Sequence, residues 1–222
     1  RIGYQHRPDI FARGIRLPPM LYAAVTEADE RVDTSEYMEI LREAVAARNG
    51  WKRILKRIDV TSRSMVALVE HGSCFAGLLA ELLWSVDRTY MMEDEFEGDN
   101  RPLAAITLSA ANFGPFPMGN DLTRLQTRFL GEPEAVDALK VKIGEPLEAE
   151  DAEDAGLVTY IYDDIDWEDE IRIFMEERAS FSPDAMTGME ANLRFAGPET
   201  METRIFGRLT AWQNWIFIRP NA

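Results

Sequence analysis

The segment 72–77, Gly-Ser-Cys-Phe-Ala-Gly, holds the residues of this chain that are best suited to chemistry. Cys74 lies three residues after His71, and a thiol is a strong nucleophile when an imidazole is hydrogen-bonded to it. The spacing alone does not produce that geometry. We therefore interpret Cys74 as a small buried residue, and His71 as a strand-end residue whose side chain is bonded to the backbone.

Metal binding is not indicated by the remaining candidate ligands. The two histidines, His6 and His71, are too far apart in the sequence for metal-ligand spacing. Acidic residues cluster at 93–99, 148–154 and 163–170, but none of these stretches has the spaced oxygen ligands and central glycine of a calcium loop. We predict no metal site, and interpret the acidic stretches as solvated loops and helix faces.

The segment 72–77 is flanked by two apolar stretches that must position it. Residues 65–69, Met-Val-Ala-Leu-Val, form a short continuous apolar run, which is typical of a strand buried on both faces of a parallel sheet. Residues 78–86 are rich in leucine and alanine and predict a buried helix, and residues 89–92 predict the next strand. This strand–helix–strand order implies a right-handed crossover.

The rest of the chain predicts a mixed domain followed by helices. Further strands are predicted at 103–108 and 156–162, with helices between them, whereas only helices are predicted after residue 162. The fold class is therefore α/β with a C-terminal helical subdomain. We expect an unplaced N-terminal arm over residues 1–34, an α/β core over 35–165 and a helical region over 166–222.

Composition excludes several classes of function. The formal net charge is −15, which disfavours binding to nucleic acid or to an anionic membrane surface. No apolar run is long enough to cross a bilayer, and no secretory signal is visible. Cys74 is the single cysteine, so no disulfide can form within the chain, and we expect a reducing, cytoplasmic compartment. Because the sequence begins without methionine, we also expect it to be part of a longer protein.

Three motifs in a fixed order resemble the crotonase (enoyl-CoA hydratase/isomerase) superfamily. They are an apolar strand with a glycine turn and a Leu/Ala helix, a Pro/Gly turn ending in Arg-Leu, and a Gly-x₄-Ala-x₂-Ala-x₂-Ala-Gly-Leu-Val helix and strand. These motifs occupy residues 66–88, 108–125 and 144–158. The resemblance implies a crotonase-like ββα-spiral core that handles acyl-CoA thioesters.

A narrower resemblance lies within that superfamily, to the C-terminal half of the benzoyl-CoA-dihydrodiol lyases, and it extends over residues 35–222. It is carried by residues 58–64, 72–77, 164–167 and 197–217. This resemblance implies a lyase that opens the oxygenated ring of a benzoyl-CoA derivative with water and releases formate. It also implies that no metal or redox cofactor is used. The CoA is part of the substrate and is not a cofactor of the enzyme.

The superfamily resemblance assigns a role to the end of the glycine turn. Crotonases hold the thioester oxygen with two backbone N–H groups, one of them from a glycine at the start of a buried helix. Gly77, with Ala76 beside it, matches that position. The alternative is that Gly77 only allows the strand to turn sharply into the helix. No counterpart of the second donor is recognised upstream of Ser35.

The two carboxylates of typical hydratases have no match at the corresponding positions, which here are Ala80 and Ala110. Glu81 is the candidate acid–base residue. However, one position along a helix rotates a side chain by about 100°, so Glu81 is expected to point elsewhere. Two hypotheses follow. The chain is part of a lyase that acts on an acyl-CoA thioester, or it is a catalytically silent crotonase half that serves packing and oligomerisation, with a second copy or a companion half as its partner.

Overall fold

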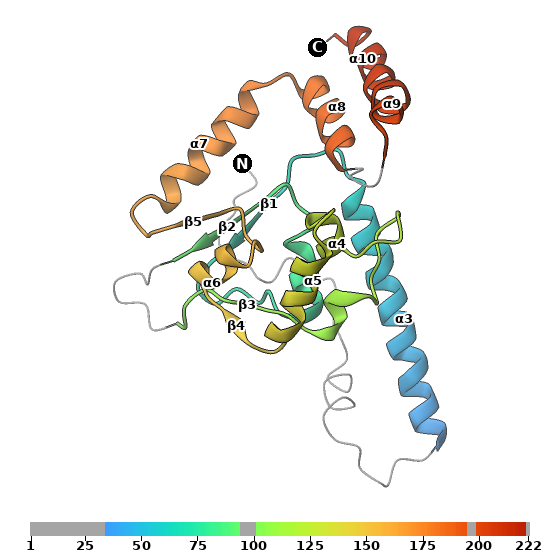
Figure 1. The fold of residues 1–222 in the computed structure, drawn as a ribbon, viewed down its shortest axis with the longest axis vertical. Helices are drawn as coiled ribbons and strands as arrows, with labels where there is room; N and C mark the ends of the chain where they lie inside the picture. Colours follow the sequence, from blue (N-terminus) through green and yellow to red (C-terminus); the bar gives the residue numbers. More distant parts are fainter. Residues whose placement is uncertain (1–33, 94–100, 195–198, 221–222) are drawn as a thin grey trace. The chain divides into compact units, whose positions relative to one another are not determined.

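The computed structural model describes residues 34–93, 101–194 and 199–220 (Figure 1). The predicted N-terminal arm, apart from its last residue, and His6 lie outside these ranges. The chain divides into two compact units, residues 1–54 and residues 55–222. The helix α3, Thr34–Asp59, spans that division as one helix of 26 residues and continues through Gly50. The features below belong to the second unit.

A three-stranded parallel sheet lies at the centre of the second unit (Figure 1). Its strands are β1 (Val66–Val69), β2 (Arg88–Met92) and β5 (Tyr160–Tyr162), in the order β1-β2-β5. The register pairs Val66 with Arg88, and Tyr90 with Tyr160. The predicted parallel pairing of the apolar run 65–69 with 89–92 is therefore confirmed. The last four residues of β2 are buried, as expected of a central strand.

A second, two-stranded sheet pairs β3 (Ile106–Thr107) with β4 (Pro146–Leu147) in antiparallel fashion. The strand predicted at 103–108 is therefore shorter than expected, and it does not join the parallel sheet. Its other side meets the glycine turn instead, where Thr107 N–H donates to the Phe75 carbonyl at 3.1 Å. Ala76 and Thr107 form a parallel β-bridge at this point.

The stretch predicted as an α-helix over residues 78–86 is a 3₁₀ helix, η1, over Gly77–Leu82. Its backbone bonds run from residue i to i−3, with Leu83 N–H donating to the Ala80 carbonyl at 3.0 Å and Ser85 N–H donating to the Leu82 carbonyl at 3.1 Å. Ser85 Oγ donates to the Glu81 carbonyl at 2.8 Å, and Thr89 Oγ1 donates to the Leu83 carbonyl at 2.8 Å. The segment remains buried as predicted, since Ala80 and Leu83 belong to the hydrophobic core.

Short helices surround the two sheets. They are η2 (Ala110–Phe113), α4 (Arg124–Arg128), α5 (Pro133–Leu139), η3 (Lys140–Lys142) and α6 (Ala149–Asp154). Their apolar side chains, among them Leu125, Leu139 and Ala152, form one core with Val69, Met91 and Ile106. The acidic side chains of α6 face solvent, as the sequence predicted for this stretch. The fold is thus the mixed α/β class expected.

The C-terminal part is helical, which confirms the predicted change of class. It consists of α7 (Trp167–Ser180), α8 (Pro183–Arg194), α9 (Met201–Arg204), η4 (Ile205–Leu209, a π-helical turn) and α10 (Thr210–Phe217). Gly188 allows α10 to pack closely on α8, because a Cβ at this position would lie 2.7 Å from Ile216 Cδ1. Among the helices of the described residues, none is both long and apolar enough to cross a bilayer.

An ion cluster fastens α8 to the sheet, and we call Asp87, Glu190 and Arg194 the edge cluster. Arg194 Nη2 donates to both carboxylate oxygens of Asp87 at 2.8 Å, and Arg194 Nη1 donates to the Ser85 carbonyl at 2.9 Å. Glu190 accepts a hydrogen bond of 2.5 Å from Ser64 Oγ. The helical region is therefore joined to the α/β core by charged groups that are largely buried.

Candidate functional site

The glycine turn between β1 and η1 is held by its own polar groups. Ser73 N–H donates to the Glu70 carbonyl, and Glu70 N–H donates to Ser73 Oγ, both at 2.9 Å. Gly72 has a φ of 77°, in the left-handed region that favours glycine. The sequence Gly-Ser-Cys-Phe-Ala-Gly therefore forms a fixed turn, and its second glycine enters η1.

Gly77 must be glycine for two reasons. Its φ is 52°, and a Cβ on it would lie 3.1 Å from Ser109 Oγ. Its N–H forms no hydrogen bond to any other residue of the described ranges, as expected for the first residue of a helix. Gly77 is half-buried and Ala76, the residue before it, is exposed. The N–H of Ala76 is already bonded, to the Cys74 carbonyl at 2.8 Å.

Asn112, in η2, connects Gly77 to the segment that follows β3. Its Nδ2 donates to the Gly77 carbonyl at 2.8 Å and to Glu81 Oε1 at 2.8 Å. Its Oδ1 accepts from Ser109 N–H at 2.8 Å, as part of a capping box at the start of η2. The side chain is buried, so these hydrogen bonds tie together two turns that are more than 30 residues apart in the sequence.

Glu81 belongs to a buried ion cluster, and we call Asp59, Glu81 and Arg124 the core cluster. Arg124 Nη1 donates to Glu81 Oε2 at 2.9 Å, while Arg124 Nη2 and Nε donate to Asp59 at 2.6 and 3.0 Å. Arg124 Nε also donates to Ser85 Oγ at 2.8 Å. All three ionic side chains are almost fully buried.

Burial sets the protonation behaviour of the core cluster. It raises the pKa of Asp59 and of Glu81 above their ordinary values, and the Arg124 guanidinium offsets this increase in part. Two carboxyl groups share one arginine, and the proximity of Asp59 is itself one of the causes that raise the pKa of Glu81. In this structure both carboxylate oxygens of Glu81 accept hydrogen bonds within the core, one from Asn112 and one from Arg124.

The positions that hold carboxylates in typical hydratases carry small side chains on either side of the candidate site. Ala80 is fully buried in the core, and Ala110 is exposed at the first position of η2. Glu81, one position after Ala80, points toward Asn112 and Arg124. The candidate site therefore offers the Gly77 N–H as a hydrogen-bond donor for a substrate oxygen. Neither Ala80 nor Ala110 offers an acid–base group.

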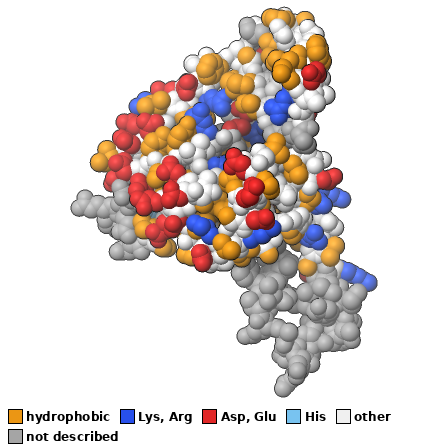
Figure 2. Space-filling model, in the orientation of Figure 1, with side chains coloured by type: hydrophobic (Ala, Val, Ile, Leu, Met, Phe, Trp, Pro, Cys, Tyr) orange, Lys and Arg blue, Asp and Glu red, His pale blue; other side chains and the backbone are white. Residues whose placement is uncertain are grey.

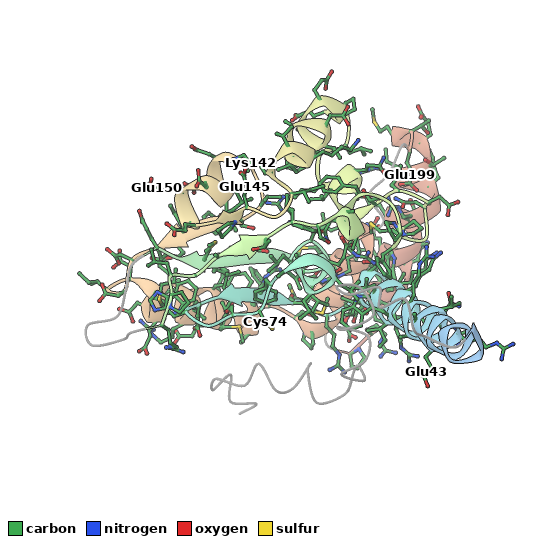
Figure 3. All side chains as sticks on the ribbon, turned by 90° about the horizontal axis from the view of Figure 1, so that it is seen from below. Glu43, Cys74, Lys142, Glu145, Glu150 and Glu199 are labelled. Carbon is green, nitrogen blue, oxygen red and sulfur yellow. The ribbon has the colours of Figure 1, made fainter. Side chains whose placement is uncertain are left out.

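The interpretation of Cys74 as a buried residue was wrong, because its thiol is exposed. Cys74 sits in the turn beyond the end of β1, where the chain leaves the core before η1 begins. Figure 3 shows it well separated from Glu145 and Glu150. His71 is buried, and its carbonyl accepts a hydrogen bond from Arg101. Within the described ranges, no cluster of His, Cys, Asp and Glu side chains could hold a metal ion.

An open pocket of about 370 Å³ lies against α4 and α5. Its lining includes Phe113, Phe129 and Val136 as apolar residues and Gln126 and Lys140 as polar ones. Gly77 and Glu81 do not line this pocket, so it is separate from the glycine turn.

Sequence reasoning missed Asn112, Ser109 and Asp59 as parts of this arrangement. Arg124 was visible only as part of the Arg-Leu pair in the second motif. Ser109 forms a local capping box with Asn112, but Asn112 also bonds to Glu81, 31 positions away, and Asp59 bonds to Arg124, 65 positions away. No local pattern indicates which distant side chain an asparagine or an aspartate will meet.

Comparisons with proteins of known structure agree with this geometry. An enoyl-CoA hydratase from Geobacillus kaustophilus matches with a TM-score of 0.61 and 18% identity, over 81% of this chain and 62% of its own. An enoyl-CoA hydratase from Thermoplasma volcanium matches with a TM-score of 0.59 and 17% identity, over 86% of this chain and 67% of its own. This chain has the crotonase fold.

Sequence similarity is much higher to one curated protein than to these structures. The crotonase-like chain is 52% identical, over 198 residues and 89% of its length, to benzoyl-CoA-dihydrodiol lyase from Aromatoleum evansii. The matched region is 34% of that enzyme, so this chain spans about a third of the length of the lyase. No family model matches the chain. The predicted resemblance, both to the superfamily and to the lyase, is confirmed.

Proposed function

We propose that this chain is the acyl-thioester-binding part of a lyase that opens the oxygenated ring of a benzoyl-CoA derivative with water and releases formate. The 52% identity to benzoyl-CoA-dihydrodiol lyase supports the substrate class. The observation that carries the proposal is the N–H of Gly77, which has no partner among the described residues and stands at the start of η1, beside exposed Ala76. Such a donor stabilises the negative charge that develops on a thioester oxygen.

Gly77 and Ala76 have different tasks in this proposal. Gly77 donates the hydrogen bond, while exposed Ala76 leaves the approach to that N–H open. Glu81 lies four positions after Gly77, and we propose that it acts through Asn112 in positioning the site. The acid and base that protonate and deprotonate the substrate would then be supplied outside this chain, because Ala80 and Ala110 carry no titratable group.

The second candidate function is a catalytically silent crotonase half, in which Glu81 would serve packing through its hydrogen bonds to Asn112 and Arg124. On that view the turn preserves the frame of a thioester site and the chain serves packing. Hydration of crotonyl-CoA by the isolated 222-residue chain distinguishes an independent hydratase from both proposals. We expect no loss of the enoyl absorbance, and clear turnover would contradict both.

We propose further that the protein assembles as a homo-oligomer or with a companion crotonase half in the cytoplasm. Figure 2 shows hydrophobic side chains gathered over the end of the unit that carries α9 and α10. Met201, Phe206, Phe217 and Ile218 are each more than two-thirds exposed there. An apolar surface of this kind supports assembly. A strictly monomeric mass in light scattering at high protein concentration would contradict it. The substrate brings its own CoA, and no other cofactor is proposed.

The proposed lyase function is tested with Gly77→Ala in the full-length protein, by measuring formate release from 2,3-epoxybenzoyl-CoA. A methyl group here meets Ser109 Oγ and disfavours the φ of 52° that aims the N–H. Loss of one oxyanion donor lowers kcat by roughly 100- to 1,000-fold, and we expect an effect in that range. Gly144→Ala is the matched control, because Gly144 has a φ of 86° but no neighbouring atom within 4 Å.

The two variants separate backbone strain from catalysis. We expect Gly144→Ala to lower the melting temperature about as much as Gly77→Ala while leaving kcat close to that of the wild type. Equal activity of the two variants, both folded, would exclude Gly77 as the donor.

A further inference from the structure

We propose that Asn112 is a positioning residue, which fixes the backbone of Gly77 so that its N–H points at the substrate oxygen. This inference rests on the proposed function, since it concerns how the same site is held in its working geometry. Asn112 was not among the candidate residues of the sequence. It lies in η2, which follows β3 in the sequence, whereas the glycine turn precedes β3. Its amide nitrogen donates to the Gly77 carbonyl at 2.8 Å.

The position of Gly77 explains why such a residue is needed. Glycine has more backbone freedom than any other residue, so a glycine donor does not hold its own direction. The chain before Gly77 is held by the bridge between Ala76 and Thr107, and by the hydrogen bond from Thr107 N–H to the Phe75 carbonyl. The chain after it is held by Asn112. Restraints on both sides of Gly77 fix its φ and ψ, and with them the direction of its N–H.

The chemistry of the site suits asparagine in particular. The two donors of Nδ2 serve the Gly77 carbonyl and Glu81 Oε1, while Oδ1 accepts from the Ser109 N–H. Aspartate has the same shape but only acceptor atoms when ionised. It would also place another carboxylate beside the core cluster, where two carboxylates already share Arg124. Leucine would fill the space without any of the three hydrogen bonds.

The core cluster in turn holds Asn112. Glu81 accepts from Asn112 with Oε1 and from Arg124 with Oε2, so the amide is attached to a fully buried arginine through one carboxylate. A donor that is already oriented before the substrate arrives stabilises a developing oxyanion without reorganisation at the moment of reaction. We therefore assign Asn112 to the orientation of the donor, and not to contact with the substrate.

The test uses the full-length protein and benzoyl-CoA labelled with ¹³C at the thioester carbonyl. Difference infrared spectra report the polarisation of that carbonyl, which lowers its stretching frequency when an oriented N–H binds it. We expect a downshift in the wild type that is reduced by at least half in Asn112→Ala and in Asn112→Asp. We also expect kcat for the epoxide substrate to fall roughly tenfold or more, with KM changed less than threefold, since misorientation acts on the transition state.

Asn192→Ala is the matched control. Asn192 Nδ2 also donates to a glycine carbonyl, that of Gly188 at 3.1 Å, but both residues lie within α8 and not at the glycine turn. We expect this variant to keep the carbonyl shift and kcat of the wild type. If Asn112→Ala does not fold, Asn112→Asp keeps the test valid, because it retains the side-chain shape and the acceptor for the Ser109 N–H.

The outcomes for Asn112 and for the proposed function are distinguishable. A wild-type protein that binds benzoyl-CoA without a carbonyl downshift, or does not bind it, overturns the thioester site itself. A wild-type downshift that persists undiminished in both folded Asn112 variants overturns only the positioning role.

Discussion

The core cluster and the edge cluster have the same composition but different environments. Each places two carboxylates around one arginine, and Ser85 touches both, through its hydroxyl in one and its carbonyl in the other. In the core cluster no side chain is more than 4% exposed, whereas in the edge cluster the Asp87 side chain is 13% exposed. The core cluster is therefore sealed around its arginine. The edge cluster has one partly hydrated carboxylate, and a second arginine stands near it, with Arg178 Nη2 3.7 Å from Glu190 Oε1.

The two clusters join different elements of the fold, and their different burial sets how much each arginine matters for stability. The core cluster joins Asp59, at the end of α3, to η1 and α4, and through Asn112 it reaches the glycine turn. The edge cluster joins β2 to α8 and so holds the helical region. Loss of a sealed arginine leaves two buried carboxylates without a counterion, whereas a partly hydrated carboxylate is compensated by water.

The largest effect that this comparison predicts is that of Arg124→Met. Removing one member of a buried ion cluster costs about 3 to 5 kcal/mol of the free energy of unfolding, because the remaining charges stay buried. We expect a loss of that size in urea denaturation at pH 7. The core cluster also orients Asn112, so the activity of the full-length protein should fall in those molecules that remain folded.

Arg194→Met should have a smaller effect, of about 2 to 3 kcal/mol, since its hydrogen bonds to charged and carbonyl groups lie nearer to solvent. We expect α8 to detach before the α/β core unfolds, and hydrogen exchange in α8 to increase more than in β1 or β2. A loss of stability equal to or larger than that of Arg124→Met would contradict the comparison.

Asp87→Asn tests the edge cluster through its pH dependence. Burial, together with the neighbouring Glu190, raises the pKa of Asp87 from 3.8 to about 6. A raised carboxyl pKa contributes stability below pH 4, and that contribution is lost as the pH increases through 6. We expect the difference in free energy of unfolding between the variant and the wild type to change in the variant's favour between pH 4 and 6. A difference that is constant with pH would show that Asp87 does not titrate there.

The smallest effect is expected at an exposed ion pair. Arg172, in α7, pairs with Asp169 at 3.0 Å and with Glu176 at 3.1 Å, and its side chain is 54% exposed. Exposed pairs of this spacing are screened by solvent and contribute little to stability. Arg172→Ala should therefore leave the urea midpoint nearly unchanged, and it serves as the reference for both arginine variants above.

Much of the fold could be predicted because local patterns carry it. The apolar run at 65–69 is a buried strand, the acidic stretch at 149–154 is a solvated helix, and the chain becomes helical after residue 166. The α-helix predicted at 78–86 was wrong in its type, because the segment forms a shorter 3₁₀ helix over Gly77–Leu82. Its backbone bonds run from residue i to i−3, and side chains of Ser85 and Thr89 bond to the Glu81 and Leu83 carbonyls of this segment, which no periodicity reveals.

The sequence by itself determined the order of elements, the glycine at position 77 and the absence of carboxylates at Ala80 and Ala110. Each of these features depends on a residue type or on a short pattern. Only the tertiary structure decided that Glu81 bonds to Asn112 and Arg124, and that a Cβ on Gly77 would lie only 3.1 Å from Ser109 Oγ. Those contacts join segments at least 31 residues apart, and the low-dielectric core that strengthens them exists only after the chain has folded.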